Sequence, residues 1–194
     1  MCLLVSSWVP AKTPTGAAKS STTSRAAAEK CGVKLKALET FAARRKPAQK
    51  QTTQFSQDEI NSYLALELSA KYHPSLKSLA ITLEENKLRA VGTIDFDRLG
   101  SSSTKLVPKI INLLFSGTHT LTADGQLVAS NRKAHFVLYQ ARFDDTTLPK
   151  YLVEQIITAV GRKQNPPFDP LKPSELFYEI DRAEVHPGYV TVYQ

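Results

Sequence analysis

The spacing of the apolar residues changes abruptly at His73-Pro74, and this change restricts the fold class more than any other feature of the chain. Before it, Ser56 and Glu59 have the spacing of a capping box, in which each side chain accepts a hydrogen bond from the backbone N–H of the other residue. Apolar side chains then recur at every fourth position, at Ile60, Leu64, Leu68 and Tyr72. This pattern predicts an amphipathic helix over residues 56–72 that ends before the proline.

After the proline, apolar and polar residues alternate, as in a strand with one buried face. Segments 79–83 and 88–97 flank the polar residues 84–87 and predict a β-hairpin. In this prediction Phe96 belongs to the buried face of the second strand, and Asp95 and Asp97 belong to its solvated face.

Residues 117–143 predict a second hairpin. Asp124-Gly125 suits a type I′ turn, in which both central residues have positive φ, so we expect strands over 117–123 and 126–143. Residues 130–133 are polar on both faces, which favours an exposed stretch or a bulge there. The apolar run 106–115 before this hairpin is too short to span a membrane and is compatible with a buried helix, a strand or a loop that covers a cavity.

The last third of the chain repeats the helix-then-hairpin order. Pro149 suits the first turn of a helix, an apolar stripe runs from Leu148 to Val160, and Gly161 suits the end of the helix. Strands over 176–185 and 189–193 follow. The pattern as a whole predicts an α+β fold in which an antiparallel sheet covers two helices on one face.

The first fifty residues differ in composition from the rest. They hold 10 basic and 2 acidic residues, whereas the remaining residues hold 15 basic and 16 acidic ones. We therefore predict a flexible basic tail over 1–52, with a short basic amphipathic helix possible over 33–46, and one folded domain over 53–194. Residues 1–11 are apolar and end in Pro10-Ala11, which is compatible with a remnant signal or anchor segment or with a chance apolar start.

The sequence contains no pattern that indicates catalysis. The four histidines lack metal-ligand spacing, Asp95 and Asp97 are expected on a solvated face, and no nucleophile elbow or glycine-rich phosphate loop is present. We therefore expect a protein that is not an enzyme and that uses no cofactor and no metal. A basic tail would bind nucleic acid nonspecifically or contact an anionic membrane, but the neutral domain has no motif for specific nucleic-acid recognition.

The expected strands carry more apolar residues than a simple two-layer core needs. Around Phe136-Val137-Leu138 both faces of the strand are apolar. Periodicity leaves two alternatives open, a well-filled core and a concave apolar pocket.

Residues 55–194 resemble bacterial envelope proteins of the tubular lipid-binding (TULIP-like) type, including LmeA-like phospholipid-binding proteins. The likeness begins at FSQDEINSYLALEL, where Ile60-Asn61 matches a pair common near the start of those domains. It continues in KLRAVGTIDF, in LPKYLVEQII, in the connector Phe168-Asp169-Pro170 and in the final strand YVTVY. Leu171-Lys172-Pro173 departs slightly from the Leu-Pro that usually precedes the last hairpin.

This resemblance implies a twisted antiparallel sheet wrapped around amphipathic helices, with a groove for lipid acyl chains. It implies non-enzymatic binding or transport of a phospholipid or fatty acid, in the periplasm or cell envelope, with a possible N-terminal membrane anchor. The lining residues that we expect are Leu64, Leu68, Ile94, Phe96, Phe136, Leu138, Ile156 and Val160. The alternative is an envelope structural or assembly protein with a filled core that binds a protein partner, and a third is nonspecific nucleic-acid binding through the tail.

Overall fold

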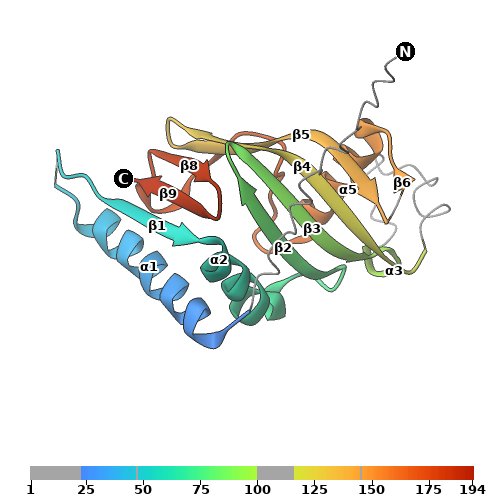
Figure 1. Ribbon diagram of the computed structural model, residues 1–194, viewed down its shortest axis with the longest axis horizontal. Helices are drawn as coiled ribbons and strands as arrows, with labels where there is room; N and C mark the ends of the chain where they lie inside the picture. The colour runs from blue at the N-terminus through green and yellow to red at the C-terminus, as the bar shows by residue number, and fades with distance from the viewer. Residues whose placement is uncertain (1–22, 47, 100–115, 145) are drawn as a thin grey trace, which may run out of the picture.

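The computed structural model describes residues 23–46, 48–99, 116–144 and 146–194. The apolar run 106–115 and the segment 1–22 lie outside the described residues. The fold is α+β with a large antiparallel sheet, as predicted, and Figure 1 shows a second, smaller antiparallel sheet beside it.

The larger sheet follows chain order. Its strands are β2 (Leu76–Glu84), β3 (Lys87–Asp95), β4 (Thr118–Ser130), β5 (Lys133–Phe143) and β6 (Thr146–Thr147), and β7 (Ser174–Glu175) also pairs with β5. The first hairpin is confirmed as β2–β3. The prediction that Phe96 lies in the strand is wrong, because the backbone N–H of Arg98 donates to Asp95 and starts the short helix α3 (Phe96–Leu99).

The second hairpin turns at a different place from the one predicted. β4 continues through Asp124-Gly125, and the turn lies at Asn131-Arg132, whose φ angles are 53° and 63°. The inward alternation that includes Leu121 continues through Gly125 to Ala129, so turning at Asn131 lets the whole apolar face pack. Residues 124–125 instead form a register shift, where Asp124 pairs with Gln140 and Gly125 pairs with Leu138.

The predicted helix over 56–72 is confirmed. It consists of α2 (Gln57–Tyr63), one π-helical segment η1 (Leu64–Leu68) and a 3-10 turn η2 (Ser69–Lys71). The capping box is present: the backbone N–H of Glu59 donates to Ser56 Oγ over 3.1 Å, and that of Ser56 donates to Glu59 Oε2 over 2.9 Å.

The smaller sheet joins distant parts of the chain. β1 (Thr52–Ser56) pairs with β9 (Tyr189–Tyr193), which pairs with β8 (Arg182–His186). β8 is shorter than the predicted strand over 176–185, because the chain first makes a 3-10 turn, η3 (Phe177–Glu179). The two helix-then-hairpin segments differ in packing, because β2 and β3 belong to the larger sheet, whereas α5 packs on the larger sheet and its following hairpin, β8 and β9, belongs to the smaller one.

Residues 25–44 correct the predicted tail. They form one long helix, α1 (Arg25–Arg44), which buries Ala28, Cys31 and Leu38 and packs beside α2 and β1 (Figure 1). Ser24 caps it by accepting a hydrogen bond from Ala27 N. The alanines at 26–28, which were assigned to the flexible basic tail, favour helix formation, and the helix begins well before the short one expected over 33–46.

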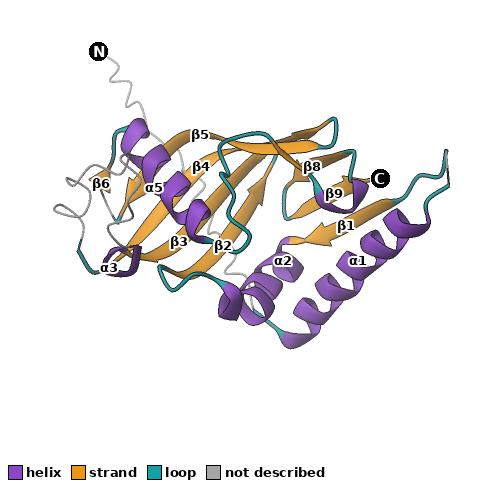
Figure 2. Cartoon of the chain, turned by 180° about the vertical axis from the view of Figure 1, so that it is seen from behind, coloured by secondary structure: helices purple, strands orange, loops and turns teal. Residues whose placement is uncertain are grey.

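The helix α5 (Lys150–Lys163) lies across one face of the larger sheet (Figure 2). Val153 and Ile156 are fully buried against the sheet. Gly161 does not end this helix as predicted. A Cβ there would lie 2.6 Å from the carbonyl oxygen of Phe168, so glycine allows the connector after α5 to fold back onto the helix.

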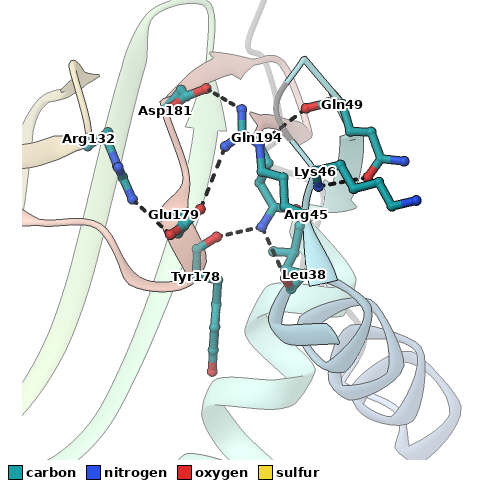
Figure 3. Close-up of polar contacts among 9 residues, drawn as sticks. All are labelled: Leu38, Arg45, Lys46, Gln49, Arg132, Tyr178, Glu179, Asp181 and Gln194. Carbon is teal, nitrogen blue, oxygen red and sulfur yellow. Dashed lines mark hydrogen bonds and ion pairs between the residues drawn. The ribbon is translucent and has the colours of Figure 1, made fainter. Parts of the chain in front are cut away.

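A polar junction ties the two sheets to α1 (Figure 3). The Arg45 guanidinium lies 3.5 Å from Asp181 and 4.0 Å from Glu179, which also pairs with Arg132 at the β4–β5 turn. Gln194 is 2% exposed, and its Nε2 donates to the carbonyl oxygens of Leu38 and Tyr178. The end of α1, the β4–β5 turn and the last strand are therefore held together by direct contacts.

Candidate functional site

A partly open apolar cavity of about 450 Å³ lies between the larger sheet and α5. This volume is within the usual range of ligand pockets, about 300–1,000 Å³. Gln164 is the only polar side chain among the described lining residues. The lining residues are Leu76, Leu79, Ile81, Leu88, Ala90, Gly92, Ile94, Leu121, Ala123, Leu127, Phe136, Ile157, Val160, Gly161, Gln164, Phe168 and Pro170.

Small residues at the centre of the sheet create this space. On the inner face, Ala90 pairs directly with Ala123, and Ala123 pairs with Ala141. In the neighbouring row Gly92 stands between Leu79 and Leu121. Side chains of one or no carbon atoms leave a hollow that the larger side chains of β2 and α5 surround.

The connector after α5 forms one wall of the cavity. Phe168 and Pro170 line it, and Phe136 N donates to Pro170 O over 2.8 Å, which fixes the connector to β5. Both polar atoms of the Gln164 side chain have a partner: its Nε2 donates to Val160 O, and its Oε1 accepts from His73 N. Its hydrogen bonds thus join the end of α5 to the loop before β2.

The eight expected lining residues fall into three groups. Ile94, Phe136 and Val160 line the cavity. Phe96, Leu138 and Ile156 lie in the adjoining buried cluster between α5 and the sheet. Leu64 and Leu68 lie on η1, outside the cavity lining, because the chain leaves the helix toward the edge strand β2.

Most of the lining residues were missed, and they include large side chains such as Leu76 and Ile157 as well as the small ones that form the hollow. Ala90, Gly92 and Ala123 occupy the same alternating positions as the inward apolar residues of their strands, so their inward orientation was predictable. The hollow in front of them was not predictable, because a small inward residue indicates a hollow only when the opposite layer leaves the space open.

Asn61, part of the pair that carried the resemblance, has a structural role. Its Nδ2 donates to Ile81 O and its Oδ1 accepts from Ile81 N, both over 2.8 Å. Gln57 accepts from Leu83 N over 2.7 Å. These amides satisfy backbone groups on the edge of β2, which protects an edge that would otherwise offer a template for another strand.

The opposite face of the sheet is polar. A pocket of about 270 Å³ contains the ion pair between Arg89 and Asp124, whose atoms lie 2.5 Å apart, and Gln140 also donates to Asp124. The hydrogen bond to Asp124 raises the pKa of Arg89. The two faces of one sheet therefore present very different surfaces.

A histidine–carboxylate pair lies at the start of β4. His119 Nδ1 is 2.8 Å from Asp144 Oδ2, and Nε2 is 2.8 Å from Ser116 O. The hydrogen bond to Asp144 raises the pKa of His119, and hydrogen bonds from Thr120 N and His119 lower the pKa of Asp144. Both ring nitrogens are engaged, so this arrangement favours a structural tie between the strands.

Buried polar groups also hold α1 against α2. Lys34 Nζ contacts both carboxylate oxygens of Glu59 over 2.6 and 2.8 Å. Burial by itself raises the pKa of Glu59, but hydrogen bonds from Lys34 and Ser56 outweigh it and hold this pKa below its ordinary value. Burial raises the pKa of the neighbouring Cys31 to about 11, so its thiol is protonated at neutral pH.

None of the helices in the described part of the chain is long and apolar enough to cross a membrane. No protein-family model, no characterised protein and no solved structure matches this chain. The resemblance to tubular lipid-binding proteins therefore stays a prediction, and the apolar cavity is the site from which function is argued.

Proposed function

We propose that the protein binds a lipid acyl chain non-covalently in the cavity between the larger sheet and α5. The observation that carries this proposal is the lining, in which Gln164 is the only polar side chain among the described residues and already has two hydrogen-bond partners. Such a surface offers nothing to a sugar or nucleotide. It suits a chain of methylene groups.

The energetics support an apolar ligand. Each methylene group moved from water into the cavity contributes about 0.8 kcal/mol, so about ten of them contribute roughly 8 kcal/mol. The loss of translational and rotational freedom offsets several kcal/mol of this. Binding therefore needs no specific polar contact, and we propose a fatty acid or one chain of a phospholipid as the ligand.

In this proposal the larger sheet and α5 are the walls of a groove of the kind that the resemblance implies, in which a twisted sheet wraps around a helix. We further propose non-enzymatic carriage of the lipid outside the cytoplasm, in the periplasm or cell envelope. These proposals follow from the resemblance, and the cavity supports the lipid-binding part of it.

Filling the cavity tests the proposal. Ala90 lines it, whereas Ala80 is exposed on the neighbouring strand β2, so Ala80→Trp is the matched control for Ala90→Trp. We expect wild type and the control to bind a fluorescent fatty acid and Ala90→Trp to lose at least tenfold in affinity, with all three folded by circular dichroism. Native mass spectrometry of the purified chain, followed by lipid extraction, should show a co-purifying lipid that Ala90→Trp lacks.

Two results contradict the proposal. One is unchanged binding by folded Ala90→Trp, and the other is a wild-type protein that carries no lipid and takes up no fatty acid. If Ala90→Trp does not fold, Ala90→Leu removes less of the cavity volume and gives the same comparison with Ala80→Leu.

A further inference from the structure

An aromatic side chain at the rim of the cavity is about half exposed to solvent. Phe168 lines the cavity and is nevertheless 48% exposed, and residues 165–167 beside it, including Pro166 and Pro167, are exposed as well. The backbone at Phe168 is tied to the end of α5, because Phe168 N donates to Gly161 O over 3.2 Å. A large apolar ring exposed at the mouth of an apolar cavity suggests that the mouth contacts an apolar environment outside the protein.

The same rim is positively charged. Arg162 and Lys172 are exposed and Lys163 is half-buried, and the exposed Lys71 precedes by two residues His73, whose backbone N–H donates to Gln164 at the end of α5. Asp169 is the one acidic residue between Gly161 and Pro173, and its carboxylate accepts from Thr158 and Leu171 and lies 3.9 Å from Arg162. The rim of the cavity, defined as Lys71 and residues 162–172, therefore has a net positive charge.

We propose that this rim docks on the surface of a bilayer that contains anionic lipids, with Phe168 inserted at the level of the headgroups. Aromatic rings favour this interface, and basic side chains are attracted to acidic headgroups. Docking here would place the cavity mouth against the bilayer, so that an acyl chain passes into it without crossing water. The inference rests on the proposed lipid site, because it names the source of the ligand.

Another exposed aromatic provides the contrast. Phe177 is 72% exposed, more than Phe168, but it does not line the cavity and has Glu175 and Glu179 as near neighbours in the chain. Acidic residues beside it would repel an anionic surface. Phe177 is therefore the matched control for Phe168.

Tryptophan fluorescence tests the docking in the full chain. Trp8 is the only tryptophan in the sequence, so Trp8→Phe gives a background into which Phe168→Trp or Phe177→Trp is introduced. With phosphatidylglycerol–phosphatidylcholine vesicles, we expect the emission of Phe168→Trp to shift to the blue and to be quenched by brominated phosphatidylcholine. Phe177→Trp should show neither effect. Removing the vesicles should reverse the signal, which distinguishes docking from a lipid retained in the cavity.

Charge reversal provides a second test of the docking proposal. Lys71→Glu combined with Lys172→Glu should weaken sedimentation with the anionic vesicles by roughly tenfold or more, since each basic residue near such a surface contributes appreciably. Lys87→Glu combined with Lys133→Glu changes the same number of charges elsewhere and should have a smaller effect. Vesicles of phosphatidylcholine alone should bind the wild-type chain weakly.

The outcomes separate the two proposals. If the chain sediments with vesicles while the emission of Phe168→Trp is unchanged, another surface such as the basic N-terminal segment binds the membrane, and the docking proposal is overturned. If Phe168→Trp reports docking but the wild-type chain takes up no fatty acid in vesicle-free buffer, the lipid site is overturned and the docking surface stands. Ala90→Trp should lose uptake of fatty acid and keep docking.

Discussion

At the scale of single residues, inward-facing glycine and alanine determine where this fold is hollow and where it is closely packed. Gly161 lets the connector lie against α5, and Gly125 lets the ring of Phe136 approach β4, since a Cβ there would lie 2.5 Å from a ring carbon. Ala90 and Ala123 have the opposite effect, because nothing fills the space in front of them. The effect of a small residue therefore depends on what the opposing layer places against it.

His119 provides a prediction at this scale. We expect its pKa, measured by NMR titration, to lie above the ordinary value of about 6.5 and to fall toward that value in Asp144→Asn, because Asp144 stabilises the charged imidazole. A folded-state pKa raised in this way stabilises the protein fully below the unfolded-state pKa, and this contribution is lost as the pH rises through the folded-state pKa. Asp58→Asn, a substitution of an exposed carboxylate on α2, should leave the titration unchanged. A His119 pKa that does not respond to Asp144→Asn would contradict the pairing.

At the scale of elements, α1 is part of the domain. Its buried residues contact the cluster formed by β1, β8 and β9, and the ion pair between Lys34 and Glu59 joins it to α2. Most of the stability of such a helix comes from packing its apolar face rather than from its intrinsic propensity.

Truncating one buried side chain tests this role of α1. Leu38 is 1% exposed, so Leu38→Ala should lower the free energy of unfolding by about 2–5 kcal/mol, measured by urea denaturation. Val33 is 70% exposed on the same helix, and Val33→Ala should change it by no more than about 0.5 kcal/mol. Equal, negligible effects of the two substitutions would show that α1 is detached in solution.

At the scale of the whole molecule, the two sheets share a hydrophobic cluster. Leu83 and Leu88 at the end of the β2–β3 hairpin pack with Val185 and Val190 of the smaller sheet. The polar junction adds contacts of Gln194 with Leu38 of α1 and Tyr178 of η3, and an ion pair of Glu179 with Arg132 at the β4–β5 turn (Figure 3). We therefore expect the described chain to unfold as one cooperative unit.

Gln194 provides the prediction for the whole molecule. Gln194→Ala leaves the buried carbonyl oxygen of Leu38 and the partly buried one of Tyr178 without this donor, which should lower the free energy of unfolding by about 1–3 kcal/mol. Calorimetry should show one transition at a lower temperature. Gln54→Ala, which removes an exposed side chain on β1, is the control. A separate early transition would mean that the smaller sheet unfolds independently.

Patterns within short stretches of the sequence determined several elements. The capping box at Ser56 set the start of α2, strand alternation set the β2–β3 hairpin, and the apolar stripe after Pro149 set α5. These patterns predicted the elements that carry Ile94, Phe136 and Val160, whereas the expectation that these residues line a groove came from the resemblance, and all three line the cavity. Their physical basis is local, because caps and side-chain periodicity depend on neighbours within a few residues.

Tertiary structure alone determined the position of the β4–β5 turn, the smaller sheet and the cavity. Asp124-Gly125 and Asn131-Arg132 are both capable of forming a tight turn, and pairing along the whole lengths of β4 and β5 selected the second. The smaller sheet joins β1 to strands more than a hundred residues later, and the cavity depends on the distance between α5 and a row of alanines. Contacts between distant segments determine all three features, and no local pattern of residues encodes them.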